Sequence, residues 1–137
     1  MDVVALIGRI LFAAIFVVSS RGHLMQTQAL AGYAGSKGVP FPKPATLVSG
    51  VVMLLGVLLL VLGIWADLGA LLLVVFLVPT AFLMHAFWRE TDGQARQQEQ
   101  VQFLKDLSLA GAALLIFALV VELGDELGLT ITGPLFG

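Results

Sequence analysis

The chain has 137 residues, of which 59% are hydrophobic and 12% charged, and its formal net charge is −2. Soluble domains are nearer half apolar and a quarter charged, so this composition, with a mean hydropathy of +1.03, is typical of a protein whose solvent is mostly lipid. It excludes a soluble enzyme and a disordered protein. Because 7 basic residues face 9 acidic ones, it also excludes a nucleic-acid-binding protein. The length allows one domain, which we take to be residues 1–137.

Four apolar runs are long enough to cross a bilayer core of about 30 Å as helices, which takes about 20 residues each. In chain order they are residues 3–20, 45–66, 68–88 and 103–121. A helix satisfies its own backbone in lipid, and the runs lack the alternation of strands. The sequence therefore predicts an all-α membrane protein, an antiparallel bundle of four transmembrane helices. The first run begins with Asp2 rather than a basic cluster, so we expect it to be retained and not cleaved as a signal peptide.

The segments between the runs differ in length and polarity. Residues 21–44 form a long link in which Pro40, Pro42 and Pro44 favour an extended chain. Asp67 alone separates the second and third runs, which predicts a tight hairpin. Residues 89–102 are polar and predict a loop, whereas the segment after Val121 is acidic and ends irregularly.

Basic residues are unevenly distributed between the two sides of such a bundle. Six of them lie on one side, which is formed by residues 21–44 and 89–102 and the start of the fourth run. The other side, which holds both termini, has only Arg9. The positive-inside rule then places the two longer links in the cytoplasm and both termini outside. The basic residues on the predicted cytoplasmic side are Arg21, Lys37, Lys43, Arg89, Arg96 and Lys105.

Ionisable residues within or beside the apolar runs are the candidates for function, because a charge in lipid costs a few kcal/mol. Arg9 has two interpretations: an ion pair with Glu122 that joins the first and fourth helices, or recognition of an anionic or carbonyl headgroup. His85 is either an interfacial residue beside Trp88 or a proton-transfer or headgroup-binding residue. Lys105 either extends to the interface or contributes to a ligand pocket.

We therefore single out Arg9, His85, Trp88 and Lys105 as a candidate ligand pocket, with Asp106 beside them as a stabiliser of its helix N-terminus. No metal site is predicted, because the sequence contains no cysteine and only two histidines. A haem held by His23 and His85 is not expected either, since His23 lies outside its apolar run. The lack of cysteine also excludes electron transfer through a dithiol of this chain.

Four short motifs, in order along nearly the whole chain, resemble those of the DoxX family of small bacterial membrane proteins with four spans. The resemblance departs from the family at two places, where Met53 replaces a frequent glutamate and His23 replaces a frequent lysine. The loss of that carboxylate removes a natural partner for Arg9 or His85. The motifs are residues 6–11 with 16–20, Tyr33 with residues 37–42, residues 84–88, and residues 103–107 with Gly111.

The resemblance implies a four-helix fold in the bacterial inner membrane and an association with membrane oxidoreductase assemblies. Related subunits belong to thiosulfate:quinone oxidoreductase, and others occur in complexes that counter oxidative and thiol stress. The resemblance favours an accessory subunit of such an assembly. The expected partners are membrane lipids and a membrane or soluble redox protein, with a homo-oligomer as a further possibility. Arg9, His85 and Lys105 offer donors to the carbonyls of a quinone, and Trp88 offers aromatic surface.

Two other functions stay open at this point. One is an assembly or structural factor without a redox ligand, in which the polar residues join helices and the partner is another protein. The other is a small oligomeric transporter, against which the missing acidic residue of the second run argues. An independent enzyme is not expected, because the sequence offers no nucleophile and no acid–base pair.

Overall fold

A computed structural model describes all of residues 1–137, as five α-helices and two short 3₁₀ helices without strands. Four of the helices are long and apolar enough to cross a membrane, which confirms the predicted all-α fold of four spans. In chain order the elements are α1 (Asp2–Met25), α2 (Thr27–Ser36), α3 (Pro42–Leu62), α4 (Ala66–Met84), η1 (Phe87–Arg89), α5 (Gly93–Leu123) and η2 (Gly124–Glu126).

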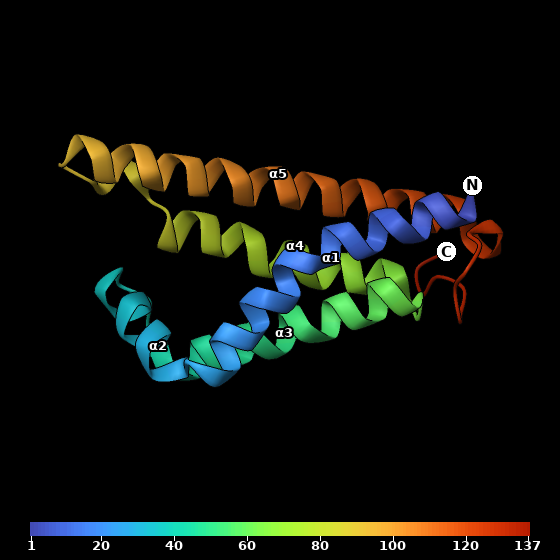
Figure 1. The fold of residues 1–137 in the computed structure, drawn as a ribbon, viewed down its shortest axis with the longest axis horizontal. Helices are drawn as coiled ribbons and strands as arrows, with labels where there is room; N and C mark the ends of the chain where they lie inside the picture. Colours follow the sequence, from blue (N-terminus) through green and yellow to red (C-terminus); the bar gives the residue numbers. More distant parts are fainter.

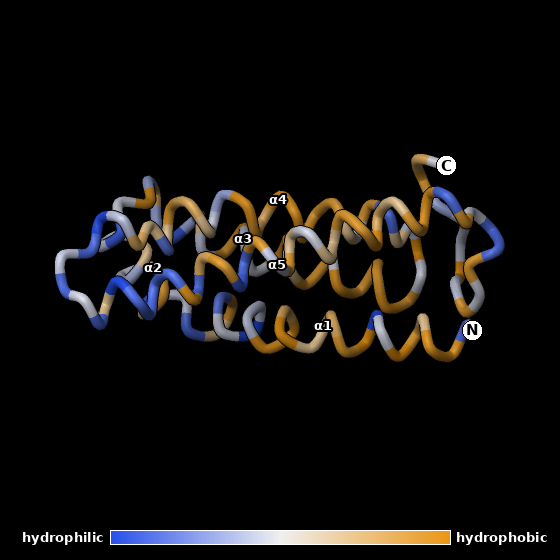
Figure 2. Tube along the Cα trace, turned by 90° about the horizontal axis from the view of Figure 1, so that it is seen from above, coloured by the Kyte–Doolittle hydropathy of each residue, from blue (hydrophilic) through white to orange (hydrophobic).

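The four long helices run antiparallel along one long axis, and both termini lie at the same end of the bundle (Figure 1). The short helix α2 lies at the opposite end, together with the start of α5. Hydrophobic residues fill the middle of the bundle, whereas hydrophilic residues gather at its two ends (Figure 2). We call these the terminal end and the α2 end.

The helices begin and end at places that differ from the sequence expectations. Residues 21–44, predicted as a loop, contain the last turn of α1, all of α2 and the start of α3. Pro42 and Pro44 lie in the first turn of α3, where a proline is tolerated because its missing N–H would have no helical partner. The hairpin between α3 and α4 turns at residues 63–65, and Asp67 lies inside α4 instead of in the turn.

The polar segment 89–102 was also predicted as a loop, and most of it is helical. Helix α5 begins at Gly93 and runs for 31 residues. Asp92 caps it, because its Oδ2 accepts a hydrogen bond of 2.8 Å from the N–H of Ala95. Glutamine, glutamate and arginine are good helix formers, so a well-capped polar run continues the membrane helix beyond its apolar part.

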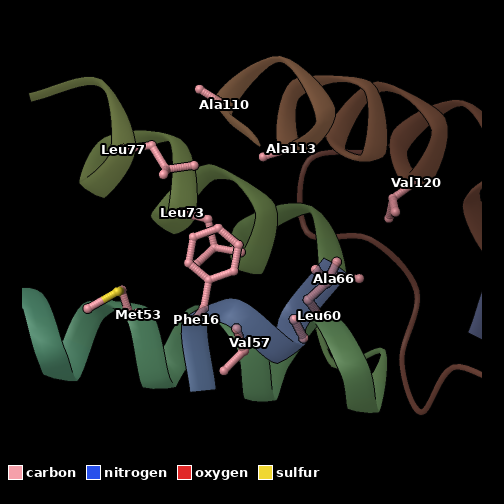
Figure 3. Packing of buried hydrophobic residues seen from close by; sticks show 11 residues of the cluster. Phe16, Met53, Val57, Leu60, Ala66, Leu73, Leu77, Ala110, Ala113 and Val120 are labelled. Carbon is pink, nitrogen blue, oxygen red and sulfur yellow. The ribbon is translucent and has the colours of Figure 1, made fainter. Parts of the chain in front are cut away.

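The core lies along the axis of the bundle and is built from α1, α3, α4 and α5 (Figure 3). Helices α3 and α4 approach each other closely where Gly56 faces Gly69. A Cβ atom added to Gly69 would lie 2.7 Å from the carbonyl oxygen of Gly56, so no larger residue fits there. The buried cluster comprises Ala13, Phe16, Met53, Val57, Leu60, Ala66, Leu73, Leu77, Ala110, Ala113 and Val120.

The packing of the helices is serial. Helix α1 packs against α3, α3 against α4, and α4 against α5, while α1 and α5 share no comparable interface. Helix α2 packs mainly against α3 and makes fewer contacts with α1. This arrangement leaves a space at the α2 end that side chains from all four long helices line.

Candidate functional site

A cavity of about 510 Å³ lies toward the α2 end of the bundle and is lined by residues of α1 to α5. Most of its walls are apolar, among them Phe16 of α1, Val52 of α3 and Phe76 of α4. Its polar lining includes His23, His85, Lys105 and Asp106, which come from three different helices or helix ends. An apolar cavity with a few polar groups is the usual form of a site for a small organic ligand.

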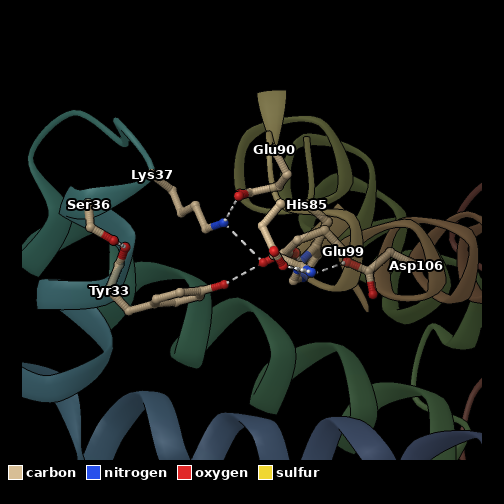
Figure 4. Close-up of polar contacts among 9 residues, drawn as sticks. Tyr33, Ser36, Lys37, His85, Glu90, Glu99 and Asp106 are labelled. Atoms are coloured by element: carbon tan, nitrogen blue, oxygen red, sulfur yellow. Dashed lines mark hydrogen bonds and ion pairs between the residues drawn. The ribbon is translucent and has the colours of Figure 1, made fainter. Parts of the chain in front are cut away.

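Glu99 of α5 is the centre of a polar network at this end (Figure 4). Its Oε2 lies 2.7 Å from His85 Nδ1, and its Oε1 accepts hydrogen bonds of 3.0 Å from both Tyr33 and Lys37. Lys37 also forms an ion pair of 2.8 Å with Glu90. One carboxylate thus joins α2 to α5 and to the residue that follows α4.

The network changes the titration of the two groups that α2 supplies. The hydrogen bond to Glu90 is the largest cause that raises the pKa of Lys37, and Glu99 adds to it. Burial raises the pKa of the Tyr33 phenol, and the neighbouring Glu99 raises it further. At neutral pH Lys37 is therefore a cation and Tyr33 a neutral donor, as the network requires.

His85 lies between two carboxylates. Its Nδ1 donates to Glu99, and its Nε2 lies 3.7 Å from Oδ2 of Asp106. Lys105 Nζ lies 3.6 Å from the other oxygen of Asp106 and donates a hydrogen bond to Gln102. Both distances to Asp106 exceed a hydrogen bond, so this carboxylate, on a residue that is 4% exposed, accepts no hydrogen bond within the chain.

His23 of α1 lines another wall of the cavity. Its Nδ1 lies 2.8 Å from the hydroxyl oxygen of Ser49 and 3.3 Å from the carbonyl oxygen of Thr46. Gly50 permits this approach of α1 to α3, because a Cβ atom there would lie 2.8 Å from the Cβ of His23. The ring also meets Phe76 of α4 edge to face at 6.0 Å.

The structure brings two of the four predicted pocket residues to the cavity, His85 and Lys105, while Trp88 does not line it. Trp88 packs in an aromatic cluster with Phe82, Phe87 and Phe103, at ring-centroid distances of 6.2, 5.2 and 5.5 Å. It therefore packs over the turn between α4 and α5, outside the cavity.

Arg9 does not lie at the cavity either, although the sequence analysis grouped it there. It is 4% exposed and lies at the terminal end, where its guanidinium donates to main-chain carbonyls. The bonds run to Leu129 at 2.8 Å, to Leu60 at 3.4 Å and to Gly128 at 3.5 Å. No ion pair joins Arg9 to Glu122. Main-chain oxygens of the C-terminal segment and α3 accept from its two terminal nitrogens, while its buried Nε has no partner.

Asp67 also lies at the terminal end and is fully buried. Its Oδ2 accepts hydrogen bonds of 2.8 Å from the N–H of Leu135 and 2.7 Å from that of Phe136. The carbonyl of Gly63 binds the same segment through the N–H groups of Ile131 and Thr132, both at 3.0 Å. Arg9 and Asp67 thus hold the irregular C-terminal segment across the end of the bundle.

The sequence analysis missed the central residue of the network, Glu99, and its partners Tyr33, Lys37 and Glu90. A signal for Glu99 is present in the sequence. Glu99 and Asp106 are seven residues apart, which places them on one face of a helix. That spacing was not informative while residues 89–102 were interpreted as a loop.

Comparison with known proteins agrees with this architecture. A family model described as DoxX matches residues 4–86. The chain belongs to the DoxX family. It is also 32% identical over 114 residues to the protein named inner membrane protein YphA of Escherichia coli (strain K12), which covers 83% of this chain and 81% of that protein. No solved structure matches the chain.

The family assignment gives the fold and the membrane character, and not the chemistry of the cavity. The matched residues include α1 to α4 and His85, whereas Glu99, Lys105 and Asp106 lie beyond them.

Proposed function

We propose that this chain is an accessory subunit of a membrane oxidoreductase assembly and that its cavity holds a lipid-soluble ring compound of the quinone class. The observation that carries the proposal is the cavity itself. Its volume of about 510 Å³ suits a substituted ring, and its polar groups gather where the apolar walls end. A flat headgroup would lie between the aromatic and aliphatic side chains and place its oxygens near His23, His85 and Asp106.

These 137 residues contain no cysteine, so the chain has no dithiol that could carry electrons. The electrons for a bound quinone or quinol would therefore pass to or from another protein, which makes the role of this chain accessory. We propose that a redox partner docks at the α2 end, where the polar start of α5 extends past the apolar part of the bundle.

We also propose the bacterial inner membrane as the location, by analogy with the relative named inner membrane protein YphA. The excess of basic residues favours an orientation with the α2 end in the cytoplasm and both termini outside. Reporter enzymes fused after Gly137 test this orientation. A reporter that works only in the periplasm should be active, whereas activity of a reporter that works only in the cytoplasm would contradict the orientation.

Native mass spectrometry of the protein, extracted gently from its own membrane, tests the proposed function. We expect an adduct with the mass of a quinone that is reduced in His85→Ala and unchanged in Lys43→Met. Lys43 is the matched control, since it is exposed, lies at the same end and forms no ion pair. A chain accompanied only by another polypeptide, with no small-molecule adduct, would contradict the proposal and favour an assembly factor.

A further inference from the structure

The hydrogen-bonding capacity of the cavity wall identifies the ligand more narrowly, if the proposed function holds. A quinone and its reduced quinol have nearly the same shape, but the quinone oxygens only accept hydrogen bonds, whereas the quinol hydroxyls also donate them. The site can therefore distinguish the two forms by which of its groups are still free to donate or accept.

His23 is an acceptor toward the cavity. The hydroxyl of Ser49 donates to the carbonyl of Thr46 at 2.9 Å, so its oxygen is left to accept from His23. Both partners of His23 Nδ1 are thus acceptors, and the hydrogen-bond network assigns the proton to Nδ1. No ion pair involves this ring, and in the neutral imidazole a proton on Nδ1 leaves a lone pair on Nε2.

Asp106 is the second acceptor. Its side chain is 6% exposed, lines the cavity and accepts no hydrogen bond from the chain, although a carboxylate has room for several. The nearest side-chain donors, Lys105 Nζ and His85 Nε2, lie 3.6 and 3.7 Å away, so the carboxylate keeps lone pairs that a ligand in the cavity can fill. Lys105 at 3.6 Å already compensates its charge, so the group still missing is a neutral donor and not a second cation.

Most donors around the cavity are directed at protein acceptors. The exception inside the wall is Ser19, whose hydroxyl has no partner in the chain and can either donate or accept. Tyr33 and His85 Nδ1 donate to Glu99, and the hydroxyl of Thr80 donates to the carbonyl of Phe76 at 2.7 Å. Lys105 donates to Gln102, and its side chain is 41% exposed, so it is the donor least confined to the cavity. The wall thus offers more free acceptors than free donors.

From this balance, we infer that the cavity is a site for the hydroxyl-bearing form, a lipid-soluble dihydroxybenzene of the quinol class, which donates one hydrogen bond to Asp106 and one to Nε2 of His23. The oxidised quinone would place a carbonyl oxygen against each of these acceptors. The chain would accordingly hold a reduced ligand in preference to an oxidised one.

The test measures the affinity of three ligands with the same ring for the full chain in lipid nanodiscs. They are a short-chain quinone, its quinol kept reduced under anaerobic conditions, and the dimethyl ether of that quinol, and titration calorimetry against empty nanodiscs corrects for partition into lipid. One charge-assisted hydrogen bond corresponds to about tenfold or more in affinity, so we expect the quinol to bind at least tenfold more tightly than the quinone and the ether.

Two matched variants assign the effect to a residue. Asp106→Asn replaces an acceptor oxygen by a donor and should remove most of the preference for the quinol. Glu122→Gln removes a carboxylate at the other end of α5 and should leave the preference unchanged. The comparison of the quinol with its ether in the unaltered chain does not depend on whether Asp106→Asn folds.

The outcomes separate this inference from the function on which it rests. If the quinone and the ether bind as tightly as the quinol, the inference is overturned and the proposed cavity ligand stands. If none of the three binds above the empty nanodiscs, the proposed function itself is overturned. A preference for the quinol that persists in Asp106→Asn would overturn the role given to that carboxylate.

Discussion

The two ends of the bundle both bury charged residues, but they satisfy them in different ways. At the terminal end, Arg9 and Asp67 are bonded to main-chain groups of the C-terminal segment. At the α2 end, His85 and Lys37 are each bonded to the side chain of Glu99, and Asp106 accepts no hydrogen bond beside a cavity. A charge in a membrane helix is therefore not by itself a sign of a site. Its partners distinguish a structural charge from a functional one.

The largest effect on stability is expected for Asp67→Leu. The substitution removes the acceptor of two N–H groups, those of Leu135 and Phe136, in partly buried hydrogen bonds. Hydrogen bonds to a charged group contribute about 1.5–3 kcal/mol each, so the free energy of unfolding should fall by roughly 3–5 kcal/mol. Thermal unfolding in detergent measures it, and a variant as stable as the original chain would show that the C-terminal segment is not held by Asp67.

A smaller loss is expected for Arg9→Met, which keeps an apolar stem but removes the donors to Leu129 and Leu60. One of these bonds is short and the other long, so we expect a loss of about 2 kcal/mol. The C-terminal segment should also become more sensitive to limited proteolysis. Arg21→Met, at an exposed position, is the control, and equal proteolysis of the two variants would contradict the role of Arg9.

Glu99→Gln differs from these two variants, because we expect a small change in the free energy of unfolding and a clear loss of ligand affinity. The network is partly exposed, and such ion pairs contribute about 1 kcal/mol or less. Binding should weaken about fivefold, because His85 loses the carboxylate that orients its ring, and loosely held site residues bind poorly. Calorimetry with the quinol measures this, and unchanged affinity with a large drop in the melting temperature would place Glu99 among the structural charges.

The smallest effect concerns alkaline pH. The raised pKa of Lys37 and that of Tyr33 mean that the folded chain retains protons that the unfolded chain loses above about pH 10. Their contribution to stability is complete below that pH and is lost as the pH rises through the folded pKa values. The melting temperature should thus fall above about pH 10, and less so in Lys37→Met. An equal fall in both proteins would exclude Lys37 as a cause.

The sequence predicts the fold well, and the physical reason is the membrane. Long apolar runs such as residues 45–66 have few alternatives to a helix in lipid, so their number and order follow directly. The ends of the helices were less predictable. Residues 93–102 are polar, and the sequence pattern does not distinguish a solvated helix from a loop until the cap at Asp92 is known.

The site was predictable in part. His85 and Lys105 stand out because ionisable residues are rare in apolar runs, and the structure places both at the cavity. Arg9 stands out for the same reason, yet its partners are main-chain carbonyls near Leu129, which carry no signature in the side-chain sequence. Lys37 and Glu99 come together only because α2 and α5 meet in space, and no local pattern encodes that contact.

The central claim is that charges at the terminal end hold the fold, while those at the α2 end hold a ligand. The most direct test is thermal unfolding of the matched variants Asp67→Leu and Asp106→Leu, each with and without the quinol, since a bound ligand raises the melting temperature. We predict that Asp67→Leu melts well below the original chain but is still stabilised by the quinol, whereas Asp106→Leu melts close to the original chain and is not stabilised. The reverse pattern, or the same pattern in both variants, would contradict the claim.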